Sequence, residues 1–249
     1  MNPAELANIA RVASEFWWYR GMEKILFRVL ERAVPARKCT RALDAGCGTG
    51  DFARVLQQHY SGRVFPCDVE AQALRIAQRS GVEYLTQCDI GNLPYACAAF
   101  DTLVSLDVLV HVQRERERIA MQEFSRVLAP GGLLVLRVAA LDILRSRHSL
   151  FIDEKQRFTR KRLVQLVTDF GFRILRCTYA NSLLFPVALA RFRIWEPLTR
   201  AKPSSGVQPV PAWLNKLLYV PLALEAELLG RGWNLPIGQS LILIAEKVA

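Results

Sequence analysis

The chain has 249 residues, of which 51% are hydrophobic, and its 33 Lys and Arg outnumber its 23 Asp and Glu to give a formal net charge of +10. This length fits one large α/β domain or two small ones, and it allows a sizeable core. The apolar fraction excludes a disordered chain. The ordinary numbers of glycine and proline (14 and 12) exclude a collagen-like chain or a Gly/Ser linker.

The apolar stretches are too short to cross a membrane. The longest uncharged stretch in the apolar C-terminal region is 177–190, whereas a spanning helix needs about 20 residues. The N-terminal segment lacks the basic start and apolar block of a secretory signal, and the six cysteines form no CxxC pair. We therefore expect a cytoplasmic protein with reduced thiols and no metal site, and attachment to a membrane surface stays open.

Helices and strands alternate along most of the chain. Apolar residues at three- and four-residue steps predict a first helix over 15–34, which Pro35 ends. The predicted strands then cover 42–44, 63–68, 83–89, 100–107, 133–139, 172–179 and 239–246. The predicted crossover helices cover 51–60, 70–80, 114–128 and 159–170, the last with Thr159 as its N-cap. This order predicts a doubly wound α/β fold whose mainly parallel sheet carries helices on both faces.

The alternation fails between the sixth and the last strand. Residues 182–237 are apolar and basic, and several prolines interrupt them. A Leu-rich helical stretch is expected over 213–229 with a break at Pro221, and a flexible loop over 202–211. We expect an N-terminal lid helix (1–38), a core (39–181 and 238–249) and a helical cap insertion (182–237).

The strongest motif lies where the first strand turns into a helix. Its sequence is Asp44-Ala45-Gly46-Cys47-Gly48-Thr49-Gly50-Asp51. Glycines let the backbone turn sharply and let a ligand approach it closely, and a carboxylate at Asp68, after the next strand, can accept bonds from ribose hydroxyls. A dinucleotide site would need a third glycine where Asp51 stands, and a P-loop would need a GK[ST] step that the chain lacks.

The pattern Asp-x-Gly-x-Gly-x-Gly resembles motif I of the class I S-adenosylmethionine-dependent methyltransferases. Three further segments, 87–90, 100–112 and 128–133, resemble successive motifs of the type 11 subfamily. The resemblance covers about residues 40–180 and the last strand. It implies a Rossmann-like, seven-stranded, mostly parallel sheet whose antiparallel last strand lies between strands five and six.

The resemblance also implies S-adenosylmethionine as the cofactor and a set of residues that hold it. This set is Arg20, Asp44, Gly46, Cys47, Gly48, Thr49, Gly50, Asp68, Val69, Asp89, Ile90 and Leu106. The carboxylate of the cofactor can meet backbone N–H groups of the glycine loop. Arg20 is a candidate for the same carboxylate, and the alternative is an ordinary surface charge.

Two histidines are candidates for acid–base chemistry on the acceptor. His111 follows the fourth strand, where a loop-shaping role is the alternative, and His148 follows the fifth strand. A neutral imidazole can serve as general base, and the nearby Arg145, Arg147 and Arg157 would lower the pKa of His148. No Asp follows His148, so the orienting carboxylate that similar proteins place there is missing.

The basic charge points to the acceptor side. Residues 137–202 hold fourteen Lys and Arg against five Asp and Glu. The alternative to a binding surface for an anionic acceptor or lipid headgroups is a solvated face. We expect methyl transfer to a small-molecule or amphipathic, lipid-linked acceptor, most readily to an oxygen atom. A cofactor-binding regulatory protein without turnover and an RNA methyltransferase stay open, and the absence of a recognisable RNA-binding module argues against nucleic acid as the partner.

Overall fold

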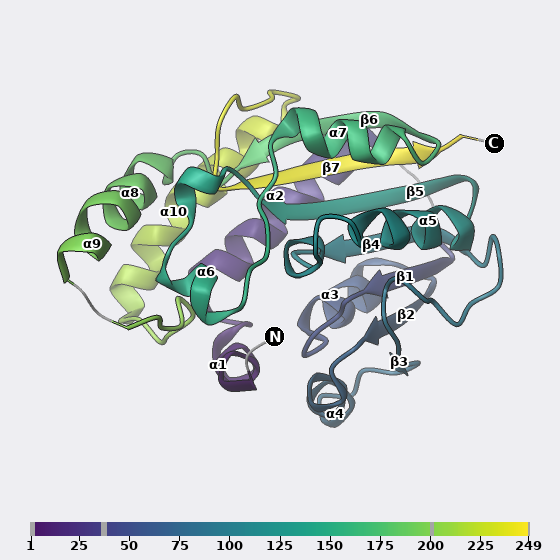
Figure 1. The fold of residues 1–249 in the computed structure, drawn as a ribbon, viewed down its shortest axis with the longest axis horizontal. Coiled ribbons are helices and arrows are strands. Elements are labelled where there is room, and N and C mark those ends of the chain that lie inside the picture. Colours follow the sequence, from purple (N-terminus) through teal and green to yellow (C-terminus); the bar gives the residue numbers. More distant parts are fainter. Residues whose placement is uncertain (1–2, 36–38, 200–201, 249) are drawn as a thin grey trace.

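The computed structural model describes residues 3–35, 39–199 and 202–248. Residues 36–38 of the expected lid, and Arg200 of the basic region, lie outside these ranges. A seven-stranded sheet with the order β3-β2-β1-β4-β5-β7-β6 forms the centre of the molecule (Figure 1). The strands are β1 (Arg41–Ala45), β2 (Arg63–Asp68), β3 (Thr86–Gln87), β4 (Phe100–Leu106), β5 (Leu128–Ala139), β6 (Phe172–Ala180) and β7 (Ser240–Lys247).

The pairing of the strands confirms the expected fold class. β1 to β5 pair in parallel, and β7 pairs antiparallel with both β5 and β6. The last strand therefore lies between the fifth and sixth, as the resemblance implied. Because the parallel strands all point the same way, their carboxyl ends meet at one edge, where ligands bind in such sheets.

Helices cover both faces of this sheet, and short turns join them. The α-helices are α1 (Pro3–Val12), α2 (Trp17–Ala33), α3 (Asp51–His59), α4 (Ala71–Arg79), α5 (Glu117–Val127), α6 (Arg147–Phe151), α7 (Arg160–Thr168), α8 (Phe185–Ala190), α9 (Glu196–Thr199) and α10 (Ala212–Gly230). The 3-10 turns are η1 (Leu109–His111) and η2 (Asp142–Leu144), and η3 (Arg191–Trp195) is a π-helical turn between α8 and α9.

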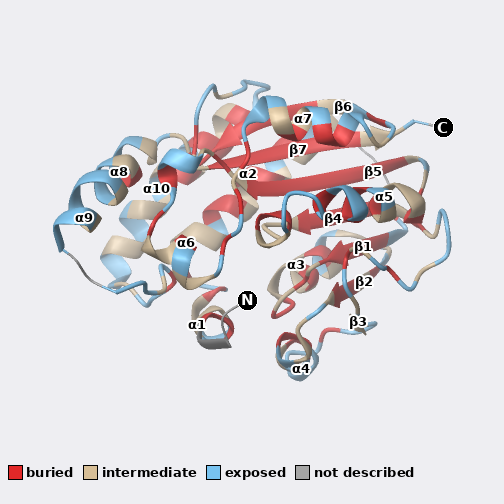
Figure 2. Cartoon of the chain, viewed as in Figure 1, coloured by how far each residue is buried: buried red, intermediate tan, exposed pale blue. Residues whose placement is uncertain are grey.

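Two separate apolar clusters hold the layers together, because successive residues of a strand point to opposite faces. On β7, Leu241 and Leu243 belong to the cluster beneath α5 and α7, whereas Ile242 and Ile244 belong to the cluster beneath α2, α3 and α10. Figure 2 shows the central strands buried almost throughout. This rigid centre holds the carboxyl edge of the sheet in place.

The structure differs from the predicted elements at several points. Strand β3 has two residues instead of the seven expected over 83–89, because it pairs only with the end of β2. Strand β5 begins at Leu128 instead of the expected residue 133, and its register with β4 shifts between Phe100 and Thr102. The helices α1 and α6 were not predicted. Thr159 caps α7 as expected, and its side chain accepts a hydrogen bond from the backbone N–H of Arg162.

Pro221 does not interrupt the Leu-rich helix, and this prediction was wrong. α10 runs unbroken from Ala212 to Gly230. One side of the helix, with Leu222, Ala226 and Leu229, is buried in the cluster that includes α2. Packing along this side outweighs the hydrogen bond that a proline removes. No helix in the described ranges has both the length and the apolar character needed to span a bilayer.

Candidate active site

The turn from β1 into α3 is built on three glycines with positive φ. Gly46, Gly48 and Gly50 have φ values of +90°, +54° and +79°, which other residues rarely adopt. A Cβ atom on Gly46 would lie 2.2 Å from a side-chain carbon of Val108, whereas one on Gly48 would meet no described atom within 4 Å. Gly46 thus lets the loop pack against the end of β4, and Gly48 leaves open space for a ligand.

Two carboxylates flank this loop at the ends of β1 and β2. Asp68 accepts hydrogen bonds from the backbone N–H groups of Gly48 (2.8 Å) and Glu70 (2.9 Å). Asp44 is 2% exposed, and its Oδ2 atom has no hydrogen-bond partner among the described residues. Burial, and then the charge of Asp68, raise the pKa of Asp44 to about 7. Such a pair fits a ligand that brings positive charge and hydrogen-bond donors.

A cavity of about 1230 Å³ opens at the carboxyl edge of the sheet. The ends of β1, β2, β4 and β5 contribute to its wall, as do α2, α6, α8 and α10. Most of the predicted site residues line this cavity. They are Arg20, Asp44, Gly46, Cys47, Gly48, Thr49, Asp68, Val69, Leu106, His111 and His148.

Three predicted site residues do not line the cavity. The space beside Gly50 is closed by Ala77 and Val82, either of which a Cβ atom on Gly50 would meet at 2.8 Å. Asp89 is exposed and accepts a hydrogen bond from the backbone N–H of Gly91, and Ile90 is buried in the core. In this structure, Asp89 and Ile90, which the resemblance assigns to the cofactor, therefore lie apart from the glycine loop's cavity.

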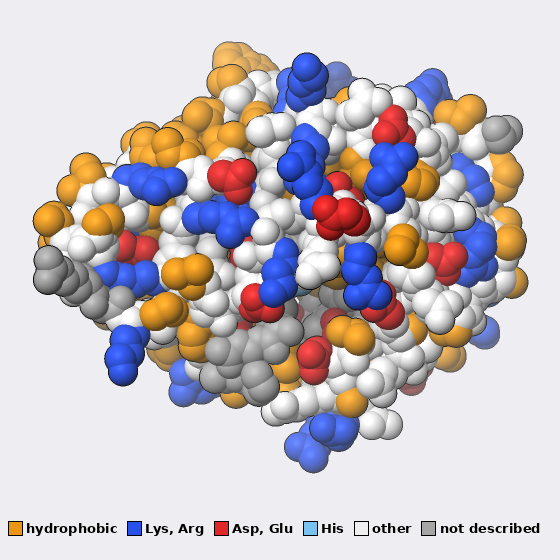
Figure 3. All heavy atoms as spheres, in the orientation of Figure 1, with side chains coloured by type: hydrophobic (Ala, Val, Ile, Leu, Met, Phe, Trp, Pro, Cys, Tyr) orange, Lys and Arg blue, Asp and Glu red, His pale blue; other side chains and the backbone are white. Residues whose placement is uncertain are grey.

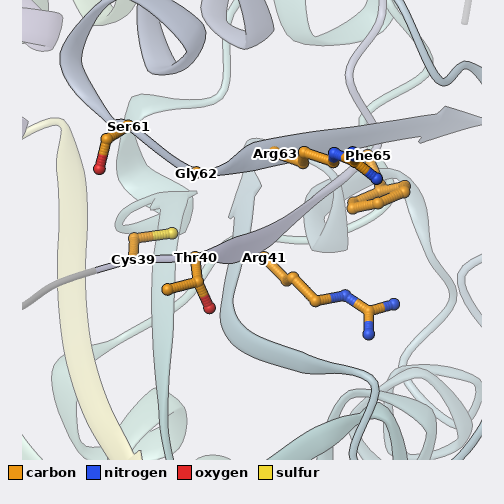
Figure 4. A pocket seen from close by; sticks show the side chains of 7 residues that line it. All are labelled: Cys39, Thr40, Arg41, Ser61, Gly62, Arg63 and Phe65. Atoms are coloured by element: carbon orange, nitrogen blue, oxygen red, sulfur yellow. The ribbon is translucent and has the colours of Figure 1, made fainter.

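A second, smaller pocket lies at the opposite edge of the sheet. It has a volume of about 560 Å³ and is lined by residues around the amino ends of β1 and β2 (Figure 4). Its guanidinium groups lie near aromatic rings, since Arg41 is 5.7 Å from the centre of Phe65 and Arg63 is 5.9 Å from that of Tyr84. Because the glycine motif and the carboxylates lie elsewhere, this pocket is not the candidate site.

Arg137 and Asp107, which line the cavity, form an ion pair that was not predicted from the sequence. Arg137 on β5 donates to Asp107 over 2.9 Å from Nε, and its Nη2 lies 2.7 Å from the same carboxylate. The guanidinium group of Arg137 also lies 5.0 Å from the ring centre of Trp18. Burial raises the pKa of the neighbouring Tyr19 hydroxyl well above its usual range. The signal in the sequence was an arginine inside an otherwise apolar strand.

Arg20 lines the same cavity from α2. It is exposed, and its guanidinium group lies 5.0 Å from the ring centre of Tyr219 on α10. The N-terminal helix and the insertion thus meet at Arg20. This contact leaves the charge facing the cavity and the solvent.

His148 lies on α6 with its side chain 34% exposed. Its Nδ1 atom accepts a hydrogen bond from the backbone N–H of Gly206 (2.9 Å) and lies 3.9 Å from Oε1 of the buried Glu5 on α1. Glu5 therefore places a carboxylate beside His148, although the residues that follow His148 in the sequence include no Asp partner. No pattern could have revealed a partner that is so distant along the chain.

The pKa of His148 is lowered, as expected, but mainly for another reason. The largest cause is burial, while Glu5 and Glu154 oppose it and Arg157 contributes in the lowering direction. Arg145 and Arg147 are held by other groups, since Arg145 donates to the backbone oxygen of Lys155 (2.8 Å) and Arg147 donates to the backbone oxygen of Glu196. The neutral imidazole is therefore favoured near neutral pH.

His111 lies on η1, directly after β4. It is half-buried, and burial lowers its pKa, while a hydrogen bond with the backbone of Asp153 opposes this shift. Its ring joins the end of β4 to the segment after α6. This contact fits the alternative in which His111 shapes the loop, and His111 also lines the cavity.

The arrangement has two chemically different ends. The loop and carboxylates at β1 and β2 form an acidic, backbone-rich end, and α6 and η3 add His148, Arg147 and Arg191 at the other. Such a cavity can hold a cationic ligand at one end and an anionic or polar one at the other. A histidine between the two can exchange a proton with the second ligand.

Known proteins resemble this chain in sequence. Residues 43–136 match the family model described as a methyltransferase domain of type 11. The malonyl-[acyl-carrier protein] O-methyltransferase of Enterobacter lignolyticus is 29% identical over 191 residues, which are 72% of this chain and 75% of that protein. The human "Probable tRNA methyltransferase 9B" is 38% identical over 107 residues, which are 42% of this chain and 22% of that protein. The chain spans about a fifth of the length of the tRNA methyltransferase 9B relatives.

Solved structures share the fold over nearly the whole chain. An S-adenosylmethionine-dependent methyltransferase from Mesorhizobium loti matches with a TM-score of 0.60 and 17% identity, covering 90% of this chain and 98% of its own. The [4+2]-cyclase SpnF matches with a TM-score of 0.59 and 21% identity, covering 93% of this chain and 84% of its own. At such identities the likeness shows a shared fold.

Proposed function

Because the chain belongs to the class I S-adenosylmethionine-dependent methyltransferases of type 11, we propose that it transfers a methyl group to an oxygen atom of a small-molecule or lipid-linked acceptor. The observation that carries this proposal is the continuous cavity at the carboxyl edge of the sheet. It joins the glycine loop at one end to His148 and the basic side chains of α6 and η3 at the other. A transfer reaction needs both ligands side by side in one enclosed space.

The first end fits the cofactor. Asp44 offers an unpaired buried oxygen, Gly48 leaves space in front of its backbone, and Asp68 lies within reach of ribose hydroxyls. Arg20, which lines the same cavity, is the candidate to bind the carboxylate group of the cofactor. S-adenosylmethionine supplies an electrophilic methyl group at a sulfonium centre, and the residues named here orient it and balance its positive charge.

At the second end, His148 is the candidate general base, and Glu5 is its positioning carboxylate. An oxygen acceptor must lose a proton, and a base that is itself oriented by a third group performs this step best. In the structure Nδ1 accepts from Gly206, so the neutral ring carries its proton on Nε2. Base function requires the other tautomer, which the Glu5 carboxylate favours once Nδ1 turns from Gly206 toward it. His111, at the wall, is the second candidate.

The acceptor class follows from the insertion. Val187 and Ala188 of α8 line the cavity together with the flanking residues Leu184 and Arg191, and α10 adds Leu218. Apolar walls with one cationic group suit an amphipathic, anionic molecule. We propose that residues 182–237 form the cap that selects it, and that residues 1–38 form the lid over the cofactor. Two of the relatives named O-methyltransferase, the Enterobacter protein and the O-methyltransferase resE of Aspergillus sclerotiorum (31% identical over 176 residues), support an oxygen acceptor.

Two other functions have some support. The name of the cyclase SpnF indicates that this fold also serves another activity, which keeps a cofactor-binding protein without methyl transfer as an alternative. The relatives named tRNA methyltransferase 9B favour RNA as the acceptor, although they align with 42% of this chain or less.

The deciding experiment follows the methyl group. The purified chain is given S-adenosylmethionine with a labelled methyl group, and fractions of lipid extract, polar metabolites and total RNA are offered separately. We expect label in a lipid or metabolite fraction, in a product that releases the labelled methyl group under conditions that cleave methyl esters or ethers and leave N-methyl groups intact. Calorimetry with S-adenosylhomocysteine runs in parallel. Binding without label in any fraction would support the protein without turnover instead.

A further inference from the structure

The insertion exposes far more apolar surface than the rest of the chain. Of the seventeen large hydrophobic side chains that are exposed in the described residues, eleven lie between 182 and 237. They include the exposed tryptophans Trp195, Trp213 and Trp233, at 64–68% exposure. Hydrophobic side chains gather on the upper left of the face in Figure 3, over the end of the molecule that holds α8, α9 and α10. Such concentrations mark binding surfaces.

On α10, the exposed apolar residues form one continuous stripe. Trp213, Leu217, Val220 and Leu224 follow each other at steps of four, three and four residues and are 51–68% exposed. Residues at these steps share one face of a helix. The opposite face is the one buried against α2. α10 is therefore apolar on both faces, and within the described residues only one face is covered, by the cluster that includes α2. Its exposed apolar face has no partner there.

The helical segment from α8 to α9 repeats this pattern. Val187, Ile194 and Leu198 follow each other at steps of seven and four residues and are 61–74% exposed, with Arg191 between the first two. Trp195 stands beside Ile194 and is 65% exposed. Both segments thus present Trp, Leu, Ile and Val outward together with basic residues. This is the composition of helices that lie in the boundary between headgroups and acyl chains of a bilayer.

The charges around the stripes indicate which surface they fit. Five exposed basic residues belong to the insertion, namely Arg191, Arg193, Lys202, Lys216 and Arg231.

The acidic groups of the insertion are buried or engaged by neighbouring groups, although the Glu227 side chain is 46% exposed. Glu225 is buried and accepts from the backbone N–H of Ser182 (2.7 Å). Glu196 accepts from the backbone N–H of Arg147 (2.9 Å), and Glu227 lies 3.1 Å from Lys24. The outward charge of the cap is therefore positive, and its complement is anionic.

From these observations we infer that the cap, residues 182–237, docks on the surface of an anionic lipid bilayer. The stripes enter the headgroup layer, and the basic residues meet the anionic headgroups. Val187 and Ala188 of α8 and Arg191 of η3 also line the proposed catalytic cavity, so Val187 and Arg191 belong to both surfaces. An acceptor embedded in the bilayer would thus reach the cavity without crossing water. Docking goes beyond methyl transfer and is measured without cofactor or acceptor.

The test compares two kinds of vesicle by flotation. One kind contains phosphatidylcholine alone, and the other also contains phosphatidylglycerol. We expect the chain to float with the anionic vesicles about tenfold more strongly, as several basic residues near the surface imply. The variant L217S/L224S is expected to lose about tenfold of this binding. K202Q/K216Q is expected to lose the preference for anionic vesicles.

The control variant removes exposed apolar groups of matched exposure elsewhere. Y84S/I119S changes two side chains that are 49% exposed and lie outside the insertion, and it is expected to float like the parent chain. Calorimetry with S-adenosylhomocysteine checks that each variant is folded, and it tests the cofactor site separately from docking. Absence of flotation, equal binding to both vesicles, or a stable dimer that L217S/L224S dissociates would overturn the inference.

Discussion

Asp44 has a buried carboxyl group whose Oδ2 atom lacks a partner among the described residues. Burial and the charge of Asp68 raise its pKa from 3.8 to about 7. A folded-state pKa above the unfolded value means that the folded chain binds the proton more tightly. The carboxyl group therefore costs least stability below pH 4, and the cost grows as the pH rises from about 4 to about 7. A cation bound beside Asp44 reverses this preference, because it favours the ionised form.

The affinity for S-adenosylmethionine is therefore expected to rise with pH through the pKa of Asp44. Between pH 6 and pH 8 the ionised fraction grows from about a tenth to about nine tenths, so the Kd should fall about tenfold. Asp44→Asn should bind about tenfold more weakly than the parent chain at pH 8 and show no such dependence. Isothermal calorimetry at both pH values measures this. Asp169→Asn, far from the cavity, serves as the control, and an unchanged parent Kd would contradict a role for Asp44.

His148, as the proposed general base, is expected to set a separate pH dependence, that of turnover at saturating cofactor. Its pKa is lowered from 6.5 by burial, so the neutral base should predominate at pH 7, and kcat should fall only below about pH 6.5. His148→Gln should lower kcat by roughly 100-fold or more and remove this acidic limb. Glu5→Gln should lower kcat less than His148→Gln does. In the double variant, kcat should fall only a little below that of His148→Gln alone. Near-normal turnover of His148→Gln with intact cofactor binding would exclude the histidine as base.

Residues that act through local backbone chemistry were predictable from the sequence. Gly46 and Gly48 adopt the positive φ values that a glycine-rich turn needs, and Asp68 is the last residue of β2. Residues that act through distant partners were not predictable. Glu5 meets His148, and Arg137 meets Asp107 and Trp18, only because the sheet and the N-terminal helices bring them together.

At the level of elements, α2 and α10 pack so closely that a glycine is required between them. A Cβ atom on Gly21 would lie 2.3 Å from Cδ1 and 2.6 Å from Cβ of Leu222, which is fully buried. In a helix, alanine in place of glycine would otherwise stabilise by about 1 kcal/mol. At Gly21 the clash with Leu222 makes the alanine substitution destabilising instead, because overpacking a core costs about 1–3 kcal/mol.

Gly21→Ala is therefore expected to lower the free energy of unfolding by about 1–2 kcal/mol in urea denaturation. Leu222→Ala alone should cost about 2–5 kcal/mol through the cavity it leaves. The double variant should lose less than the sum of the two, because the alanine at 21 fills part of that cavity. Gly230→Ala is the matched control, since its Cβ would meet Arg28 at an ordinary 3.5 Å. Additive losses would show that the two helices are not coupled through this contact.

The same packing explains which elements the sequence could predict. Strands and helices with a strong apolar period, such as β4 and α7, lie within one or two residues of their expected bounds. α10 continues through Pro221 because contacts with α2 hold it, and such tertiary contacts leave no local signal. α1 and α6 are short helices whose few buried residues, such as Leu6 and Ser149, form no clear period. The insertion is accordingly the part that the sequence predicted least well.

At the scale of the whole molecule, the basic residues that are concentrated between residues 137 and 202 of the sequence lie among acidic residues on the surface. Many of them pair with acidic residues at the surface, among them Arg145 with Asp142 (3.3 Å), Arg173 with Glu246 (2.5 Å) and Lys155 with Asp153 (2.6 Å). On the face shown in Figure 3, blue side chains stand beside red ones. Binding to nucleic acid draws its energy from many simultaneous phosphate contacts. A mixed surface of this kind offers few of them.

Binding to RNA is therefore expected to be weak and to vanish at moderate salt. Fluorescence anisotropy with labelled tRNA should show a shallow dependence on salt, because the slope of log K against log salt reflects the number of phosphates neutralised. We expect no retention at physiological ionic strength and no methyl label in tRNA. A steep slope together with label in tRNA would favour the RNA methyltransferase over the lipid-linked acceptor. The variant K202Q/K216Q separates the two partners further, because it should weaken vesicle binding while leaving cofactor affinity unchanged.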